Sequence, residues 1–195
     1  SKKTNIDLRK KLNLKNKYVI SYIGTIGMAH ALDFIIESIN DINKNFHFVF
    51  IGDGAMKKKL IIESSKKKLN NVTFVDSVPR NEIFDYIDIS DASLVNLKKS
   101  DDFKKVIPSK IFENVFLKKP ILLGVEGESK YLIEKYSLGI AFLPENKDSF
   151  LSALDKIIHF KIDSKYERNR LNFLDSFDRK KLAKKMLYEV IFDLK

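Results

Sequence analysis

The sequence contains no cysteine and no tryptophan, and only four prolines and seven glycines occur among its 195 residues. The absence of cysteine excludes disulfide bonds, cysteine-ligated metal sites and a thiol nucleophile, and it agrees with a reducing compartment. No apolar run approaches the ~20 residues that span a bilayer, and the opening residues Ser-Lys-Lys-Thr are polar. We therefore expect a soluble, cytoplasmic chain that carries no secretory signal.

Negative charge is also scarce, because 26 acidic residues face 36 basic ones and leave a net charge of +10. Lysine accounts for 31 of the basic residues and arginine for 5, in scattered runs such as 57–59 and 66–68. Such runs usually form solvated helix faces, and no aromatic residues are interleaved with them as in nucleic-acid-binding motifs. We expect no nucleic-acid partner, whereas weak attraction to the inner face of a membrane stays open.

Apolar runs alternate with amphipathic segments along most of the chain. The first run is 18–23, and the segment 31–42 after it has apolar residues at spacings of 3, 4 and 7, which predicts a strand followed by a helix. The same pattern recurs with strands at 46–51, 72–75, 92–97, 121–124 and 140–143, followed by helices near 56–61 and 81–87, at 109, and near 128–136 and 147–160. Alternation of this kind predicts an α/β fold, a Rossmann-like doubly wound parallel sheet of about six strands with helices on both faces.

The two ends of the chain do not follow this repeat. Residues 5–16 read as a short polar helix, and 165–174 and 178–194 read as two closing helices, the last with Asp178 as its candidate cap. No flexible linker, low-complexity tract or internal repeat divides the chain. We expect a single domain over 1–195, with a core at about 18–160 and a C-terminal helical tail at about 165–194.

Ligands of an open parallel sheet bind at the carboxyl ends of the strands. The loop after the first strand contains Gly24 and Gly27, which let backbone N–H groups approach a phosphate. The nicotinamide fingerprint would need glycine at position 22, where Tyr22 stands, so dinucleotide binding is disfavoured. After the second strand, Gly52 is a candidate for making room beside a nucleotide, whereas Asp53 is expected to be a turn residue.

Two later loops add further candidates. The backbone near Val78, after the third strand, could carry a nucleotide base. Ser109 is expected to be the N-cap of the next helix, and Lys110 in its first turn could neutralise a diphosphate. Glu113 leans toward the same helix N-terminus and could accept hydrogen bonds from the two hydroxyls of a ribose. Together these residues predict a nucleoside-diphosphate site.

A family resemblance becomes visible in the order of these motifs. The segments Y-I-G-T-I-G-M-A-H-A-L-D, F-V-F-I-G-D-G, V-T-F-V-D-S-V, P-S-K-I-F-E, K-K-P-I-L, G-E-S-K-Y-L-I and L-G-I-A-F resemble the C-terminal half of a GT-B glycosyltransferase of the family 4 type. The likeness covers about residues 18–160 and is strongest to bacterial O-antigen or capsule enzymes such as acetamido-fucose transferases. It implies an enzyme that binds a nucleotide sugar as substrate, uses no cofactor, and passes the sugar to a saccharide or lipid-linked saccharide acceptor.

The resemblance also implies roles for individual residues. Glu113 would hold the ribose hydroxyls, and the turn of Ser109 and Lys110 would face the diphosphate together with the loop 24–27. The backbone near Val78 would contact the base, which the resemblance suggests is uracil. The catalytic residues themselves stay unknown.

The chain departs from the family pattern at several of these positions. Many members carry arginine directly after the first glycine of the loop and Lys-Gly at its end, where this chain has Thr25, His30 and Ala31. His30 could still supply a hydrogen bond or partial charge to a phosphate. Family members often have a glutamate where this chain has Lys105, so Lys105 is expected to add positive charge near 105–108, where the donor sugar would lie.

Two further expectations concern what the chain lacks. His30, His47 and His159 are isolated in the sequence, so no metal site is expected. The resemblance implies an N-terminal acceptor domain that is absent here, so the chain is expected to be an inactive fragment of a longer enzyme. Two alternatives stay open: half of a UDP-sugar epimerase with a similar fold, and a non-catalytic module that binds a nucleotide, RNA or a protein.

Overall fold

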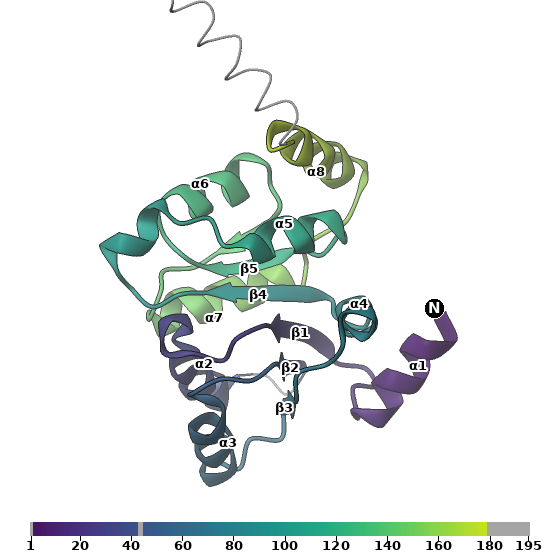
Figure 1. The fold of residues 1–195 in the computed structure, drawn as a ribbon, viewed down its shortest axis with the longest axis vertical. Coiled ribbons are helices and arrows are strands. Elements are labelled where there is room, and N and C mark those ends of the chain that lie inside the picture. The colour runs from purple at the N-terminus through teal and green to yellow at the C-terminus, as the bar shows by residue number, and fades with distance from the viewer. Residues whose placement is uncertain (1, 43–44, 179–195) are drawn as a thin grey trace, which may run out of the picture.

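The computed structural model describes residues 2–42 and 45–178 (Figure 1). Its centre is a six-stranded sheet with the strand order β3-β2-β1-β4-β5-β6, in which every neighbouring pair is parallel. The strands are β1 (Tyr18–Ile23), β2 (Phe46–Ile51), β3 (Val72–Val75), β4 (Ala92–Asn96), β5 (Ile121–Gly124) and β6 (Gly139–Ala141). This order confirms the predicted doubly wound parallel sheet.

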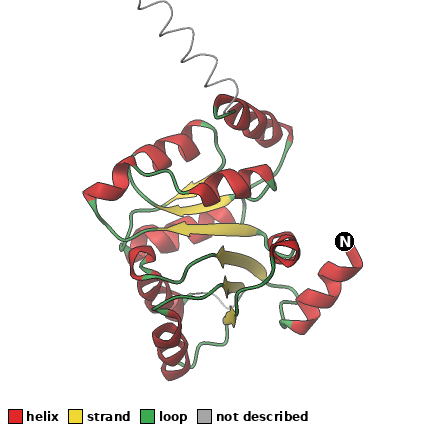
Figure 2. Cartoon of the chain, viewed as in Figure 1, coloured by secondary structure: helices red, strands yellow, loops and turns green. Residues whose placement is uncertain are grey.

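Helices connect the strands and lie on both sides of the sheet (Figure 2). They are α1 (Lys2–Lys11), α2 (Leu32–Ser38), α3 (Lys57–Lys66), α4 (Arg80–Asp88), α5 (Ser109–Phe116), α6 (Glu128–Lys135), α7 (Lys147–Ile157) and α8 (Ser164–Ser176), with 3₁₀ turns η1 (Met28–His30), η2 (Ile39–Asp41) and η3 (Asp101–Lys105). Within the described ranges, no helix is long and apolar enough to cross a membrane.

Several helix bounds differ from the prediction. α1 ends at Lys11 instead of position 16, because Asn13 and Asn16 adopt left-handed backbone angles with φ of 55° and 59° that stop a helix. The segment predicted as one helix over 31–42 divides into α2 and η2. The predicted helix over 178–194 lies outside the described residues from position 179 onward.

Alternate residues of each strand enter different clusters, as the period of a strand requires. Ile20, Phe48 and Leu122 pack in one cluster with the buried faces of α2 and α7. On the opposite face, Leu123 joins a second cluster with α5, α6 and α8. Val19 joins a third with Leu14 and Ile89. The core therefore lies on both faces of the sheet, and the loops at the ends of the strands are left for other roles.

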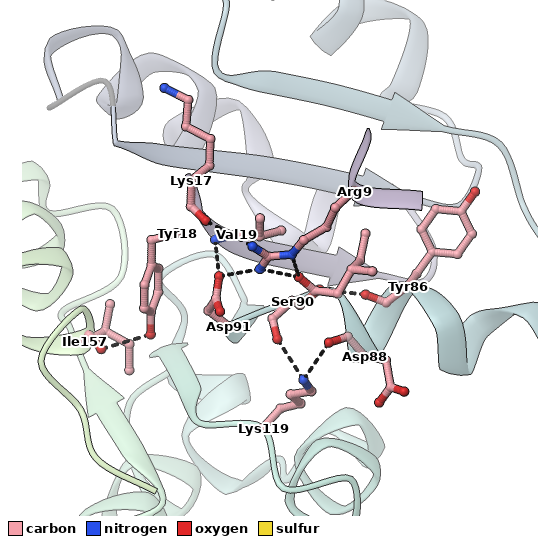
Figure 3. Close-up of polar contacts among 11 residues, drawn as sticks. Arg9, Lys17, Tyr18, Val19, Tyr86, Asp88, Ser90, Asp91, Lys119 and Ile157 are labelled. Carbon is pink, nitrogen blue, oxygen red and sulfur yellow. Dashed lines mark hydrogen bonds and ion pairs between the residues drawn. The ribbon is translucent and has the colours of Figure 1, made fainter. Parts of the chain in front are cut away.

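A polar cluster fastens α1 to the amino ends of the central strands (Figure 3). The Arg9 guanidinium donates to the Ile89 carbonyl oxygen at 2.6 Å and pairs with the Asp91 carboxylate at 2.8 Å. Asp91 in turn accepts from the Val19 N–H at 2.8 Å, and the Lys119 ammonium donates to the Ser90 carbonyl at 2.8 Å. These contacts fix the amino end of the sheet, opposite to the edge where ligands are expected.

The carboxyl edge opens between β1 and β4, where the strand order reverses. These two strands pair at Ile20 with Ala92 and at Ser21 with Ser93, whereas β1 continues to Ile23 against β2. β4 pairs on its other side with β5, up to Asn96. A narrow crevice lined by Tyr22, Asn96 and Lys110 lies at this switch point of the sheet, the position at which doubly wound folds bind ligands.

Candidate functional site

The loops after β1 and β2 pack backbone to backbone at the carboxyl edge. The N–H of Gly24 donates to the Ile51 carbonyl at 2.9 Å, and the N–H of Ile26 donates to the Asp53 carbonyl at 2.8 Å. Gly52 has φ of +140°, and a Cβ at this position would overlap the Gly24 carbonyl group. Glycine is therefore required at position 52, because the two loops touch there and the backbone has a conformation that other residues rarely adopt.

These loops line a cavity of about 250 Å³. Gly24 and Thr25 line it from the first loop, Gly52 from the second, and Ser77 and Val78 from the segment after β3. The structure thus brings three of the predicted loops around one space. Asp53 is exposed at the same cavity, and its carboxylate accepts from the Gly54 N–H at 2.8 Å.

The N-terminus of α5 faces this edge of the sheet. The prediction that Ser109 is its N-cap is wrong: Pro108, with ψ of 135°, takes the cap position, and Ser109 is the first helical residue. The extended backbone of Pro108 causes the shift, since the helix can begin only after it. The N–H groups of Ser109 and Lys110 have no acceptor within the helix and can serve a ligand.

The side chain of Lys110 crosses the crevice toward β1. Its ammonium lies 4.7 Å from the centre of the Tyr22 ring and 3.3 Å from the Tyr22 hydroxyl. A Cβ built on Gly24 would lie 2.6 Å from the Lys110 Cε, so the lysine lies directly against the glycine loop. Burial lowers the pKa of Lys110, and the Glu113 carboxylate opposes this change. An ammonium group that lies against a glycine backbone and is partly desolvated attracts anions strongly.

The end of β4 holds the last part of the first loop. The Asn96 amide donates to the His30 carbonyl at 2.8 Å and more weakly to the Ala31 carbonyl at 3.4 Å, and the Lys98 N–H donates to the Ala29 carbonyl at 2.9 Å. Ala31 has φ of 42° and ψ of 44°, a left-handed conformation that costs a residue with a side chain about 1 kcal/mol or more.

His30 itself is half-buried in a narrow cavity that Tyr22, Asn96 and Lys110 also line. Its Nδ1 lies 3.4 Å from the Asn96 carbonyl oxygen, and its ring meets the Tyr22 ring edge-on at 5.6 Å. Burial, followed by the Lys110 charge, lowers the pKa of His30. Burial also holds the pKa of Tyr22 well above its usual value, and the Tyr22 hydroxyl donates to the Thr25 carbonyl at 2.6 Å.

Three other predicted residues, Gly27, Lys105 and Glu113, line neither of these cavities. Glu113 is exposed on the second turn of α5, within electrostatic range of Lys110, and Gly27 precedes η1 with an ordinary φ of −111°. Lys105 is exposed at the end of η3 and does not line either of the two cavities described above. In the described part of the chain, no group of three or more His, Asp or Glu side chains is placed to hold a metal ion.

Sequence reasoning missed two residues of this crevice. Tyr22 entered only as a departure from the nicotinamide fingerprint, yet its ring is the surface on which Lys110 lies. Asn96 is a fully buried amide at the end of an apolar strand. The sequence did carry a signal for Asn96, since it is a polar residue at the end of an apolar strand. A buried amide needs hydrogen-bond partners, and those of Asn96 lie in the neighbouring loop.

The fold and the crevice define a doubly wound α/β domain of the GT-B type. A family model described as "Glycosyl transferases group 1" matches residues 4–172, and the chain belongs to this family. No curated protein matches the sequence. This match does not extend to the narrower likeness to family 4 acetamido-fucose transferases.

Solved structures with the same fold are distant in sequence. Alr3699/HepE of Anabaena, solved with UDP-glucose, has a TM-score of 0.73 at 16% identity, covering 97% of this chain and 53% of its own. A glycosyltransferase from Rickettsia africae has a TM-score of 0.75 at 15% identity, covering 100% and 53%. WaaG, a glycosyltransferase involved in lipopolysaccharide biosynthesis, has a TM-score of 0.70 at 16% identity, covering 94% and 50%. The chain thus spans about half the length of these structures.

Proposed function

We propose that this chain binds the nucleotide-sugar donor of a glycosyltransferase and that the donor is a UDP-sugar. The observation that carries the proposal is the crevice between β1 and β4. There the Lys110 ammonium lies against Gly24, beside the free N–H groups at the start of α5. A diphosphate is the ligand that this combination of cation, glycine backbone and helix N-terminus suits. Membership in a glycosyltransferase family supports the same ligand, and HepE was solved with UDP-glucose.

In this proposal the diphosphate lies between two segments. Its oxygens accept from the backbone of the loop 24–27 on one side and from the turn of Ser109 and Lys110 on the other. Thr25 is exposed in the same loop and adds a hydroxyl donor where many family members have arginine. Lys110 then supplies the charge that neutralises the leaving diphosphate when the sugar is transferred.

The nucleoside would occupy the neighbouring cavity. Val78 and Gly52 line this space of about 250 Å³, so the base would lie on backbone and small apolar groups there. Glu113 would accept from both ribose hydroxyls, in keeping with its exposure and with its effect on Lys110. Lys105, at the end of η3, would face the donor sugar; like Glu113, it lines neither described cavity.

Calorimetric titration with UDP-glucose, UDP, GDP and ADP tests the ligand class. We expect UDP and UDP-glucose to bind and the purine nucleotides to bind more weakly. Glu113→Ala should weaken UDP binding about tenfold or more, since it removes hydrogen bonds to a charged acceptor worth about 1.5–3 kcal/mol. Glu134→Ala, on α6, is the matched control and should leave affinity unchanged. Equal affinities of both variants would refute the ribose role, and no binding of any nucleotide would refute the function.

Transfer of the sugar is a separate proposal. We propose that the acceptor is a saccharide or lipid-linked saccharide, as suits polysaccharide assembly; WaaG, which has a similar fold, is a glycosyltransferase involved in lipopolysaccharide biosynthesis. The acceptor site would belong to a second domain, so the 195-residue chain would bind donor without transferring sugar. Release of UDP from UDP-glucose together with a new glycoside, catalysed by this chain alone, would contradict that expectation.

Weak attachment to an anionic membrane surface is supported by α3 and the residues that follow it. Lys58, Lys66, Lys67 and Lys68 are exposed, and the range 61–62 adds two exposed isoleucines between them. Each lysine near an anionic surface contributes about 1 kcal/mol of attraction. We expect co-sedimentation with phosphatidylglycerol vesicles that is lost in high salt. Equal binding to neutral phosphatidylcholine vesicles, or preference for RNA over vesicles, would refute this attachment.

A further inference from the structure

His30 differs from the other cation-forming groups of the crevice because its charge depends on pH. Its ring is held between the end of β4 and the Tyr22 ring, with Nδ1 3.4 Å from the Asn96 carbonyl oxygen and the ring centres of His30 and Tyr22 5.6 Å apart. The cavity beside the ring is also lined by Lys110. The imidazole therefore has a defined orientation at the place where the diphosphate is proposed to bind.

This orientation decides which nitrogen carries the hydrogen in the neutral ring. A carbonyl oxygen can only accept, so Nδ1–H donates to Asn96 and Nε2 is left with a lone pair. No hydrogen bond to Nε2 occurs within the described residues. A phosphate oxygen also offers only lone pairs, so neutral His30 cannot bind it through Nε2. Protonation at Nε2 creates a donor and adds a positive charge.

The charges around the ring oppose protonation in the absence of a ligand. Lys110 reaches it from α5, and burial together with this charge lowers the pKa of His30, while the contact with Asn96 works in the other direction. Tyr22, on β1, stays a neutral phenol because burial raises its pKa. Two further charged side chains belong to the neighbouring elements. Lys98, just after β4, is exposed, and the Asp33 carboxylate on α2 lies 3.6 Å from the Lys59 ammonium. A diphosphate would reverse this balance, because it brings negative charge to the ring.

We propose that His30 is a proton-linked contact to the donor diphosphate: it is neutral in the free chain and takes up a proton at Nε2 as the nucleotide sugar enters. The proton comes from solvent, and the protonated nitrogen donates to a phosphate oxygen. This inference rests on the proposed donor function and extends it, because it makes donor affinity depend on pH through a single residue.

The sign of this dependence follows from linkage. The pKa of His30 is lowered in the free chain and raised in the complex, so the complex holds more protons between these two pKa values. Donor affinity is therefore highest at low pH and falls, by up to about tenfold per pH unit, as pH rises from the free to the bound pKa. Above the bound pKa it becomes constant.

Calorimetry with UDP-glucose between pH 5.5 and 8.5 tests the proposal. This ligand is suitable because its diphosphate is esterified at both ends, whereas a terminal phosphate titrates with a pKa of about 6. Titrations in two buffers of different ionisation enthalpy give the number of protons taken up. We expect uptake of a fraction of a proton near neutral pH, and at least a several-fold loss of affinity between pH 6 and pH 8.

Three variants assign the proton to its residue. His30→Gln keeps an amide at this position and should bind UDP-glucose without proton uptake and with a flat pH profile. His30→Lys carries a permanent charge and should bind at pH 8 more tightly than the unchanged chain, again without uptake. His159→Gln is the matched control, since His159 is exposed at the end of α7, and it should retain the full pH dependence.

The outcomes separate this inference from the function on which it rests. UDP-glucose binding with equal affinity at all pH values would overturn the proton-linked contact and leave the donor function standing. Proton uptake that persists in both His30→Gln and His30→Lys would also overturn it. Absence of UDP-glucose binding at every pH would refute the donor function, and this inference with it. Using two substitutions keeps the test valid if one of them fails to fold.

Discussion

The glycines of the first two loops offer a direct test of how the crevice is built. Gly52 has φ of +140°, and a Cβ there would lie 2.9 Å from the Gly24 carbonyl carbon and overlap its oxygen. Gly27 has φ of −111°, and a Cβ there would meet nothing nearer than the Thr25 methyl at 3.7 Å. Gly52→Ala and Gly27→Ala therefore add the same methyl group with opposite expected results.

The magnitude for Gly52→Ala has two parts. An alanine at such a positive φ costs about 1–3 kcal/mol. Relieving the overlap also moves the Gly24 backbone, which strains the hydrogen bond from its N–H to the Ile51 carbonyl, a bond worth about 1 kcal/mol. We expect the free energy of unfolding to fall by about 3 kcal/mol in Gly52→Ala. For Gly27→Ala we expect a change of less than about 0.5 kcal/mol.

Urea unfolding at pH 7 measures both values, and UDP-glucose titration adds a functional readout. Gly27→Ala should fold normally yet bind UDP-glucose more weakly, because its methyl group keeps the phosphate away from the loop backbone. If Gly52→Ala proves as stable as Gly27→Ala, the contact between the two loops is wrong. If Gly27→Ala binds UDP-glucose like the unchanged chain, the loop 24–27 does not hold the diphosphate.

Three other predictions concern stability. Ala31→Gly removes left-handed strain and should raise the unfolding temperature by about 2–4 °C in a thermal melt; no rise would contradict the strain. Burial, and to a smaller extent the Lys17 charge, lowers the pKa of His47 to about 4. The neutral imidazole therefore contributes up to about 3 kcal/mol to the free energy of unfolding above pH 6.5, and this contribution is lost as pH falls toward 4. Urea unfolding at pH 7 and pH 5 should show this loss, and His47→Gln should abolish it. Arg9→Met removes the bonds to Ile89 and should cost about 1–2 kcal/mol in urea without changing UDP-glucose affinity, whereas reduced affinity would contradict its place at the opposite end of the sheet.

The sequence located the central strands well because their burial is complete. The run Phe46–Ile51 is buried at every position and ends at a glycine, so β2 was predicted with its observed bounds. β6 lies at the edge of the sheet and is only half-buried, and it runs over Gly139–Ala141 instead of the predicted 140–143. A half-buried edge strand has a weaker apolar pattern, which explains why its bounds were missed.

The candidate site was predictable where a residue's place depends on its own helix or loop. The position of Glu113 one turn into α5 followed from the spacing, and so did the approach of Lys110 to the crevice. The cap at Ser109 failed because the backbone of Pro108 decides where the helix begins. Contacts between residues 66 and 88 positions apart, His30 with Asn96 and Lys110 with Tyr22, have no local signal in the sequence.

Asn96 explains how the first loop keeps its shape although alanine occupies its left-handed position. The amide of Asn96 holds the carbonyl groups of His30 and Ala31, and each such bond is worth about 1 kcal/mol, enough to offset the strain at φ of 42°. Gly124 on the neighbouring strand makes room for this amide, since a Cβ there would overlap the Asn96 Oδ1. The orientation of the His30 ring therefore depends on the packing of β4 against β5, because these strands position the amide that fixes the loop.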